Sequence, residues 1–105
     1  MLSSPWVRCV ETLAPLAAST KATITEESVL GEGEGDAAVA RVDAWLTARL
    51  TVLCTHGDVV DAILAYLSRM GVPLGSKTQS PKGSVWVLDG RPGSISIARY
   101  LPPAV

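Results

Sequence analysis

The five residues TVLCT (51–55) constrain the fold more than any other stretch of this chain. They form a short run of strand-forming residues without polar alternation, which is typical of a parallel strand covered on both faces. A helix pattern follows directly, capped by Asp58 and ended by Gly71 and Pro73. Its apolar face holds Val60, Ile63, Leu64 and Leu67. A covered strand that leads at once into an amphipathic helix predicts an α/β fold.

The first part of the chain repeats this order of strand and helix. Residues 1–4 have the pattern of a strand end, and Ser4 with Pro5 forms a helix start. The helix that follows carries an apolar stripe of Trp6, Val10, Leu13 and Ala17. Pro15 is expected to kink this helix or to end it near Ala14, because proline lacks the N–H that a helix interior needs.

The middle of the chain predicts a short strand at 23–25, an acidic glycine-rich loop at 31–36 and a second helix capped by Asp36. The apolar side of that helix is expected to hold Val39, Val42, Leu46 and the stem of Arg49, with Trp45 beside them. Residues 84–89 and 94–101 alternate and are joined by a glycine- and proline-containing turn, which predicts an antiparallel hairpin. We therefore expect one domain over 1–105, a three-layer α/β sandwich with a mostly parallel sheet and this hairpin at its end.

Composition excludes several classes of function. The formal charge of −1, without a basic run, gives no surface for nucleic acid. The longest apolar stretches are too short to span a membrane, and the start of the chain lacks a signal-peptide pattern, so we expect a cytoplasmic protein. The two cysteines, Cys9 and Cys54, are far apart in the sequence and are expected to be free thiols. With one histidine and dispersed acids, we expect no metal and no cofactor.

Two loops are expected to share one edge of the sheet, because ligands of open α/β sheets bind beyond the carboxyl ends of parallel strands. The first loop leads to Arg8, about one turn into the first helix, and the second holds His56 followed by Gly57. Each residue alone is better explained as a surface arginine or a strand-end histidine. Together, a guanidinium and an imidazole held protonated by a nearby anion predict a phosphate pocket. Lys77 and Lys82 lie in the later polar loop, 75–83, within expected reach of such a phosphate.

Three segments resemble the histidine phosphatase superfamily, which has the phosphoglycerate-mutase-like fold. They are LSSPWVRCVETLAPLA (2–17), TVLCTHGDVVDAIL (51–64) and GSVWVLD (83–89), the last resembling especially the actinobacterial members. The resemblance implies that Arg8 binds phosphate and that His56 is the second, non-nucleophilic active-site histidine. It also implies a general-acid carboxylate within 24–36. Glu32 is the best match there, with Glu34 and Glu27 as alternatives. Glu11 departs from the family, which often has glutamine at this position.

The family's nucleophilic histidine lies in an Arg-His-Gly motif at the end of its first strand, and this chain contains no such motif. The resemblance therefore implies a truncated domain that lacks the first strand and retains a pocket for a small phosphorylated ligand. Phosphomonoester hydrolysis, the family's activity, is expected to be lost or very weak. The missing strand would leave unpaired sheet edges that favour a homodimer. The alternatives are a phosphate-binding module without catalysis and a structural or interaction module.

Overall fold

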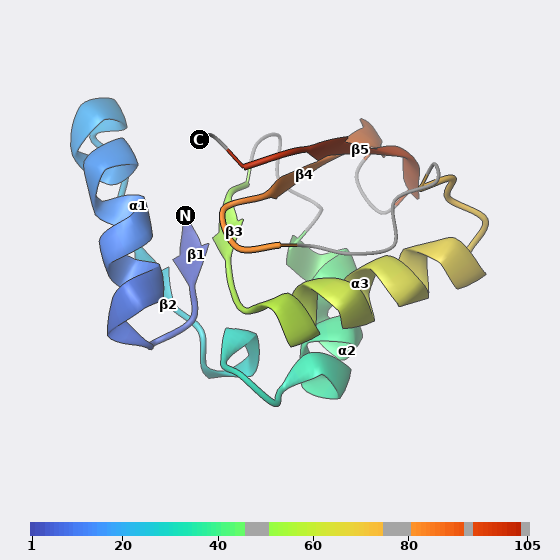
Figure 1. Cartoon of the computed structure of the whole chain (residues 1–105), viewed down its shortest axis with the longest axis horizontal. Coiled ribbons are helices and arrows are strands. Elements are labelled where there is room, and N and C mark those ends of the chain that lie inside the picture. Colours follow the sequence, from blue (N-terminus) through green and yellow to red (C-terminus); the bar gives the residue numbers. More distant parts are fainter. Residues whose placement is uncertain (46–50, 75–80, 92–93, 104–105) are drawn as a thin grey trace.

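The computed structural model describes residues 1–45, 51–74, 81–91 and 94–103 of the chain. The elements follow one another as a short strand, a helix, a strand, two further helical segments, a strand, a helix and a hairpin (Figure 1). In chain order they are β1 (Leu2–Ser3), α1 (Val7–Thr20), β2 (Thr25–Glu26), a 3-10 turn (Ser28–Leu30), α2 (Gly35–Trp45), β3 (Leu53–Cys54), α3 (Gly57–Arg69), β4 (Val85–Arg91) and β5 (Ser94–Leu101).

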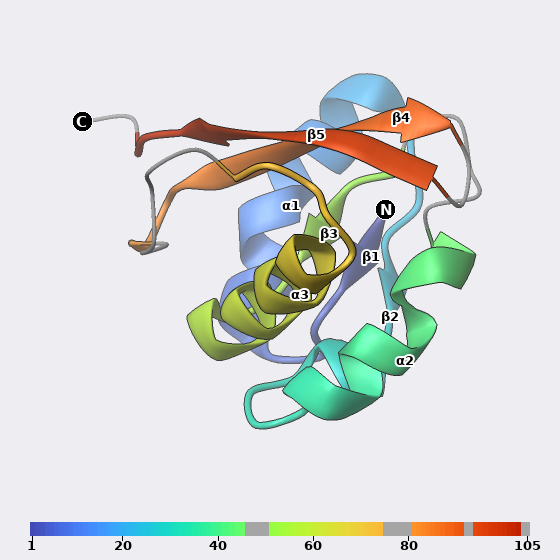
Figure 2. The ribbon, with the colours of Figure 1, turned by 90° about the vertical axis from the view of Figure 1, so that its right-hand side faces the viewer.

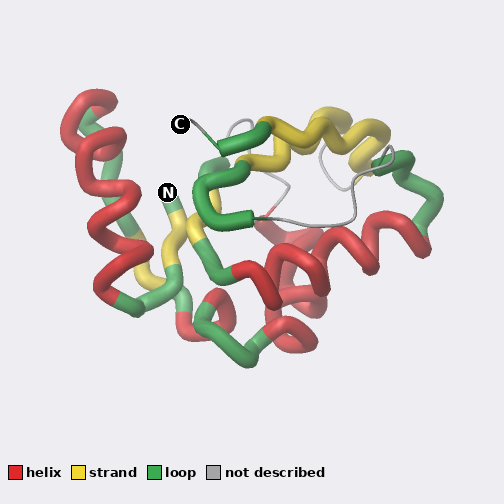
Figure 3. The backbone as a smooth tube through the Cα atoms, in the orientation of Figure 1, coloured by secondary structure: helices red, strands yellow, loops and turns green. Residues whose placement is uncertain are grey.

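The described strands form two small sheets (Figure 3). One is a parallel sheet in the order β2-β1-β3, in which Leu2 pairs with both Thr25 and Leu53. The other is the antiparallel pair β4-β5, with a register shift between Asp89 and Gly90. The mixed α/β class, the parallel sheet and the C-terminal hairpin are thus confirmed.

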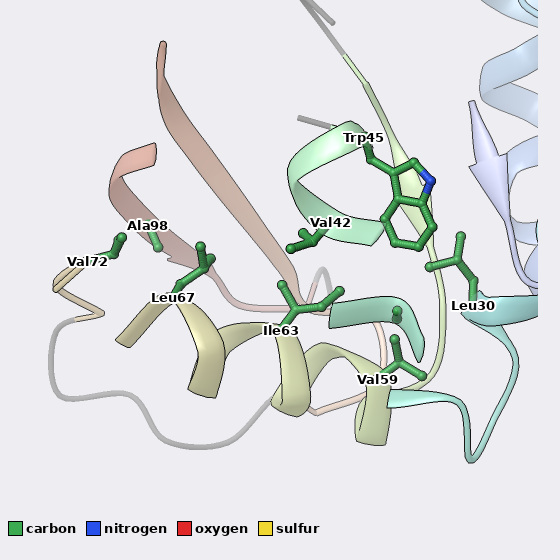
Figure 4. Close-up of a cluster of buried hydrophobic side chains, with 9 residues drawn as sticks. Leu30, Val42, Trp45, Val59, Ile63, Leu67, Val72 and Ala98 are labelled. Carbon is green, nitrogen blue, oxygen red and sulfur yellow. The ribbon is translucent and has the colours of Figure 1, made fainter. Parts of the chain in front are cut away.

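One apolar core joins the helices to the hairpin (Figure 4). The helices α2 and α3 pack closely, and a Cβ added to Gly35 would lie only 2.9 Å from the Cβ of Ala62. Figure 2 shows the hairpin lying above α3 and α2 in that view. The buried members of the core are Leu30, Ala38, Val42, Trp45, Val59, Ile63, Leu67, Val72 and Ala98.

The first helix differs from the prediction in both its start and its course. It runs through Pro15 to Thr20 instead of ending near Ala14, and Lys21 ends it with a left-handed φ of 57°. Trp6, not Ser4, is the N-cap residue, and Ser4 accepts the Trp6 N–H through its Oγ at 3.3 Å. Leu13 and Ala17 are buried as predicted, with Cys9 as the third buried residue of the helix. Trp6 is instead 43% exposed.

Several local predictions differ from the structure. Asp36 and Asp58 lie inside the first turns of α2 and α3 and do not cap them. The strand predicted at 51–55 covers only Leu53–Cys54, both half-buried. Leu46 and Arg49, expected on the second helix, and Lys77 lie outside the described residues. Gly71 follows α3 with a φ of 90°, as expected for the residue that ends a helix.

None of the helices in the described part of the chain has the length and apolar character required to cross a membrane.

Candidate functional site

The site lies at the edge of the parallel sheet where β1 and β3 end. These two strands are neighbours and run in the same direction, so the residues after them meet. The Ser4 N–H donates to the Cys54 carbonyl at 2.9 Å, which continues the pairing to the strand ends. Beyond this bond, α1 and α3 both begin at the same edge, and Ser4 and His56 lie buried between them.

His56 is held at both ring nitrogens. Its Nε2 lies 2.9 Å from Ser4 Oγ, and its Nδ1 lies 3.1 Å from Nη2 of Arg8. An arginine side chain only donates hydrogen bonds, so Nδ1 must be the acceptor and carry no proton. The imidazole is therefore neutral in this arrangement, with its proton on Nε2 donated to Ser4 Oγ. The sequence analysis predicted a protonated, cationic imidazole. That form needs a proton on Nδ1, and it would require Arg8 to move away from this atom.

Arg8 joins the histidine to an acidic residue from another loop. Its Nη2 is 3.6 Å from Oε1 of Glu32, and its guanidinium carbon lies 4.8 Å from the centre of the Trp6 ring. The Trp6 ring also meets the His56 ring edge-on at 4.8 Å. The side chains of Arg8 and Glu32 are 59% and 51% exposed, so a ligand can reach both. The structure thus brings together the three residues singled out from the sequence, Arg8, His56 and Glu32.

The two alternative glutamates, Glu27 and Glu34, make other contacts in the structure. Glu27 pairs with Arg41 at 3.2 Å. Glu34 lies at the turn into α2, where its N–H donates to the Gly31 carbonyl at 3.1 Å. Of the three candidates, Glu32 is the one whose ion pair with Arg8 places it at the site.

Two hydrogen bonds place the Glu32 loop against the end of β3. The Thr55 hydroxyl donates to the Leu30 carbonyl, and Gly33 N–H donates to the Asp58 carboxylate at 2.7 Å. These bonds tie the loop on both sides of Glu32 to the residues that flank His56. Asp58, which the sequence suggested as a helix cap, therefore positions the acidic loop instead.

Sequence reasoning missed Ser4 and Trp6 as partners of the histidine. The signal for Ser4 was present, because it follows a strand expected to lie beside the strand that precedes His56. Nothing in the sequence indicated this role for Trp6, because its position in the apolar stripe predicted that it is buried in the core.

The two cysteines are neighbours in the fold although they are distant in the sequence. Cys9 is buried, with its Sγ 3.8 Å from Nε2 of His56. Burial, then the charge of Cys9 and a hydrogen bond with its thiol, raise the pKa of Cys54 to about 11. Within the described ranges, no group of three or more His, Cys, Asp or Glu side chains is arranged to hold a metal ion.

A cavity of about 280 Å³ lies elsewhere, lined by Met1, Leu16, Thr20, Ala22 and Val52. Met1 and Val52 precede β1 and β3, so this cavity is at the amino ends of the strands. It is therefore separate from the His56 site at their carboxyl ends.

No family model and no curated protein matches the chain. Any assignment of function therefore has to come from the geometry of this site. An exposed guanidinium, a buried imidazole and the starts of two helices meet at one edge. Such a set of donors suits a small anion, because helix N-termini carry partial positive charge and arginine donors fit oxyanions.

Proposed function

We propose that this chain is a histidine-phosphatase-like domain that binds the phosphoryl group of a small phosphorylated ligand and hydrolyses it very slowly or not at all. The observation that carries the proposal is the contact between Arg8 Nη2 and His56 Nδ1, at 3.1 Å, where β1 and β3 end. The resembled family uses an arginine and a histidine at the matching positions of its motifs to hold phosphate.

Typical interaction free energies indicate that Glu32 competes only weakly with a phosphate for Arg8. Arg8 and Glu32 are both more than half exposed, and such a pair contributes about 0–1 kcal/mol. A charge-assisted hydrogen bond contributes about 1.5–3 kcal/mol. The exposed ion pair with Glu32 is therefore a weak competitor for a phosphate at Arg8, and the starts of α1 and α3 would add favourable potential for the anion.

Binding of an anion at Arg8 and His56 together requires a proton. In the present arrangement Nδ1 accepts from Arg8, so it has no N–H to offer a phosphate oxygen. If a phosphate takes over the Arg8 donor, Nδ1 can take up a proton and donate to the same anion.

Catalysis lacks its nucleophile. A phosphohistidine intermediate needs an imidazole nitrogen in line with the phosphorus and free to attack. The one histidine of the sequence has its Nδ1 facing Arg8 and its Nε2 facing Ser4. We assign His56 to charge stabilisation, and Glu32 to the proton-donor role toward a leaving group that the resemblance implies.

The proposal includes a place for the family's first strand. In the described residues, β3 pairs with β1, and β4 pairs with β5. A further strand beside β3 would widen the parallel sheet. With α1 on one side and α2 and α3 on the other, as Figure 1 arranges them, the result would be a three-layer sandwich. Its carboxyl end would bring a nucleophile beside His56, and the coding sequence just upstream of Met1 can be read for an in-frame Arg-His-Gly.

The test is a titration with sulfate, a dianion that keeps its charge between pH 6 and pH 8, followed by the NMR signals of the His56 ring. We expect the ring signals to move and to reach a plateau as the site fills. Arg8→Ala should weaken binding by about 10- to 150-fold, the equivalent of one charge-assisted hydrogen bond. Arg41→Ala, which removes an arginine paired with Glu27 away from the site, is the matched control and should not change binding.

Inorganic phosphate should move the same signals, while p-nitrophenyl phosphate should not be hydrolysed above background. Ring signals that stay in place at tens of millimolar sulfate and phosphate would reject the pocket. Rapid turnover that is lost in His56→Ala would reject the inactive assignment and leave the pocket intact.

Among the described strands, β3 has a neighbour on one side, β1, and this favours a second candidate, an interaction module that pairs its other edge with another copy of the chain. Sedimentation over a range of protein concentrations tests it. A concentration-dependent dimer is expected under this alternative, and a folded monomer throughout the range would argue against it.

A further inference from the structure

The indole of Trp6 is an exposed aromatic surface beside the pocket proposed for phosphate. Trp6 is 43% exposed, and its ring centre lies 4.8 Å from both the guanidinium carbon of Arg8 and the centre of the His56 ring. We propose that this indole binds an aromatic substituent of the ligand, so that the pocket prefers aryl phosphates to alkyl phosphates. The inference rests on the proposed phosphate site and names the class of ligand that the site takes.

The contacts of the Trp6 ring leave one side of it for a ligand. Arg8 and His56 contact each other at 3.1 Å, so they cannot lie on opposite faces of an indole whose centre is 4.8 Å from each of them. Both therefore lie toward the same side of the ring. The Nε1 edge borders the acidic loop, since a Cβ added to Gly31 would lie 3.9 Å from Nε1. The exposed surface of Trp6 is thus left to the other face and the remaining edges.

The backbone of Trp6 is fixed before any ligand binds. Its N–H donates to Ser4 Oγ at 3.3 Å, and its carbonyl accepts the N–H groups of Cys9 and Val10 at 3.0 and 3.2 Å. These bonds tie the residue to the buried end of the strand on one side and to the first turn of α1 on the other. Stacking on a ring that is already positioned costs little conformational entropy of the protein.

The charged group and the aromatic surface adjoin each other, which suits a phosphate attached directly to a ring. Arg8 supplies donors for the phosphoryl oxygens, and the same guanidinium lies against the Trp6 ring. A group joined to that phosphate through one ester oxygen can therefore reach the indole. Val7, the next residue, is 69% exposed and adds apolar surface at the start of α1. Because aromatic pairs are favourable beyond the area that they bury, a phenyl ester gains a contact there that a methyl ester lacks.

Titrations with phenyl phosphate and methyl phosphate at pH 8 provide the test, because both esters are dianions at this pH and differ in the ring. The His56 ring signals report occupation of the pocket, and the Nε1–H signal of Trp6 reports stacking. We expect phenyl phosphate to bind about 2- to 10-fold more tightly than methyl phosphate, the range of one aromatic pair. It should also move the Trp6 signal upfield, by ring current, beyond any shift that methyl phosphate causes. The signal of the buried Trp45 should stay in place.

The variants Trp6→Leu and Trp6→Phe separate the ring from the phosphate site. The ratio of the two affinities is compared within each variant, so that any change in phosphate binding itself cancels. Trp6→Leu should abolish the preference for phenyl phosphate, and Trp6→Phe, which keeps an aromatic face, should retain most of it. If either variant folds poorly, the wild-type comparison decides alone.

The outcomes separate this inference from the function on which it rests. Equal affinities of the two esters for the wild-type chain overturn the inference and leave the phosphate site intact. A preference that survives in Trp6→Leu overturns it as well, because the phenyl ring would then bind elsewhere. If inorganic phosphate and both esters leave the His56 signals in place, the proposed function and this inference are both overturned.

Discussion

At the scale of single residues, the site depends on the guanidinium of Arg8. It contacts His56, Glu32 and Trp6, which come from three different segments of the chain. It also decides the chemical form of the histidine, because a donor at Nδ1 leaves the ring proton on Nε2. The state of His56 is thus set by a residue on another helix and not by its own neighbours in the sequence.

The tautomer of His56 is a direct prediction at this scale. At pH 8, nitrogen-15 spectra should show Nε2 as the protonated nitrogen and Nδ1 as the unprotonated one. Arg8→Ala removes the donor to Nδ1 and should increase the population of the Nδ1–H tautomer. Arg41→Ala should leave the spectrum unchanged, since Arg41 pairs with Glu27. A wild-type ring protonated mainly at Nδ1 would contradict the hydrogen bond from Arg8.

At the scale of elements, the acidic loop is positioned by the end of β3 and the start of α3. Thr55 and Asp58 flank His56 and its glycine, and each accepts or donates a bond to the loop that holds Glu32. The same short stretch therefore supplies the imidazole and fixes the carboxylate opposite it. A change in this stretch is expected to move both partners of Arg8.

The Thr55→Val variant tests this coupling. It keeps the shape of the side chain but leaves the carbonyl of Leu30, a fully buried residue, without its donor. An unsatisfied buried acceptor costs about 1–3 kcal/mol, so the free energy of unfolding should fall by that amount in urea titrations. Thr20→Val removes a similar bond, to the Leu16 carbonyl, at an exposed position, and it should change stability by less than about 0.5 kcal/mol. Equal effects of the two changes would show that the loop bond does not matter.

At the scale of the whole molecule, the parallel sheet alone is too small to organise the chain. Its described strands have two residues each, and most of the core lies between α2, α3 and the hairpin. Ala98 on β5 and Leu67 on α3 lie in the same cluster (Figure 4). The C-terminal hairpin therefore covers α2 and α3, the helices before and after His56. The stability of the site should therefore depend on packing at a distance from it.

Leu67→Ala is expected to show that dependence. Leu67 is 3% exposed, and large-to-small changes of this kind lower the free energy of unfolding by about 2–5 kcal/mol. Leu101→Ala makes the same change at a side chain that is 44% exposed, and its effect should be below about 1 kcal/mol. Chemical denaturation of both variants provides the measurement. A loss at Leu101 as large as that at Leu67 would contradict the placement of the core.

Elements with a strong local signal were predictable from the sequence. The third helix was recognised because Ile63, Leu64 and Leu67 recur at helical spacing and Gly71 supplies the left-handed turn that ends it. The hairpin was recognised from strict alternation around a turn. The convergence of Arg8 and His56 also followed, because parallel neighbouring strands must end at one edge.

The sequence by itself therefore determined the order of the main helices and strands and which two loops face each other, because periodicity and strand direction are local or topological properties. Only the tertiary structure decided which atoms meet. Ser4, Trp6, Cys9 and Asp58 each received its role from a partner far away in the chain. Such partners depend on how helices pack against strands over a few ångströms, and no spacing along the chain encodes that distance.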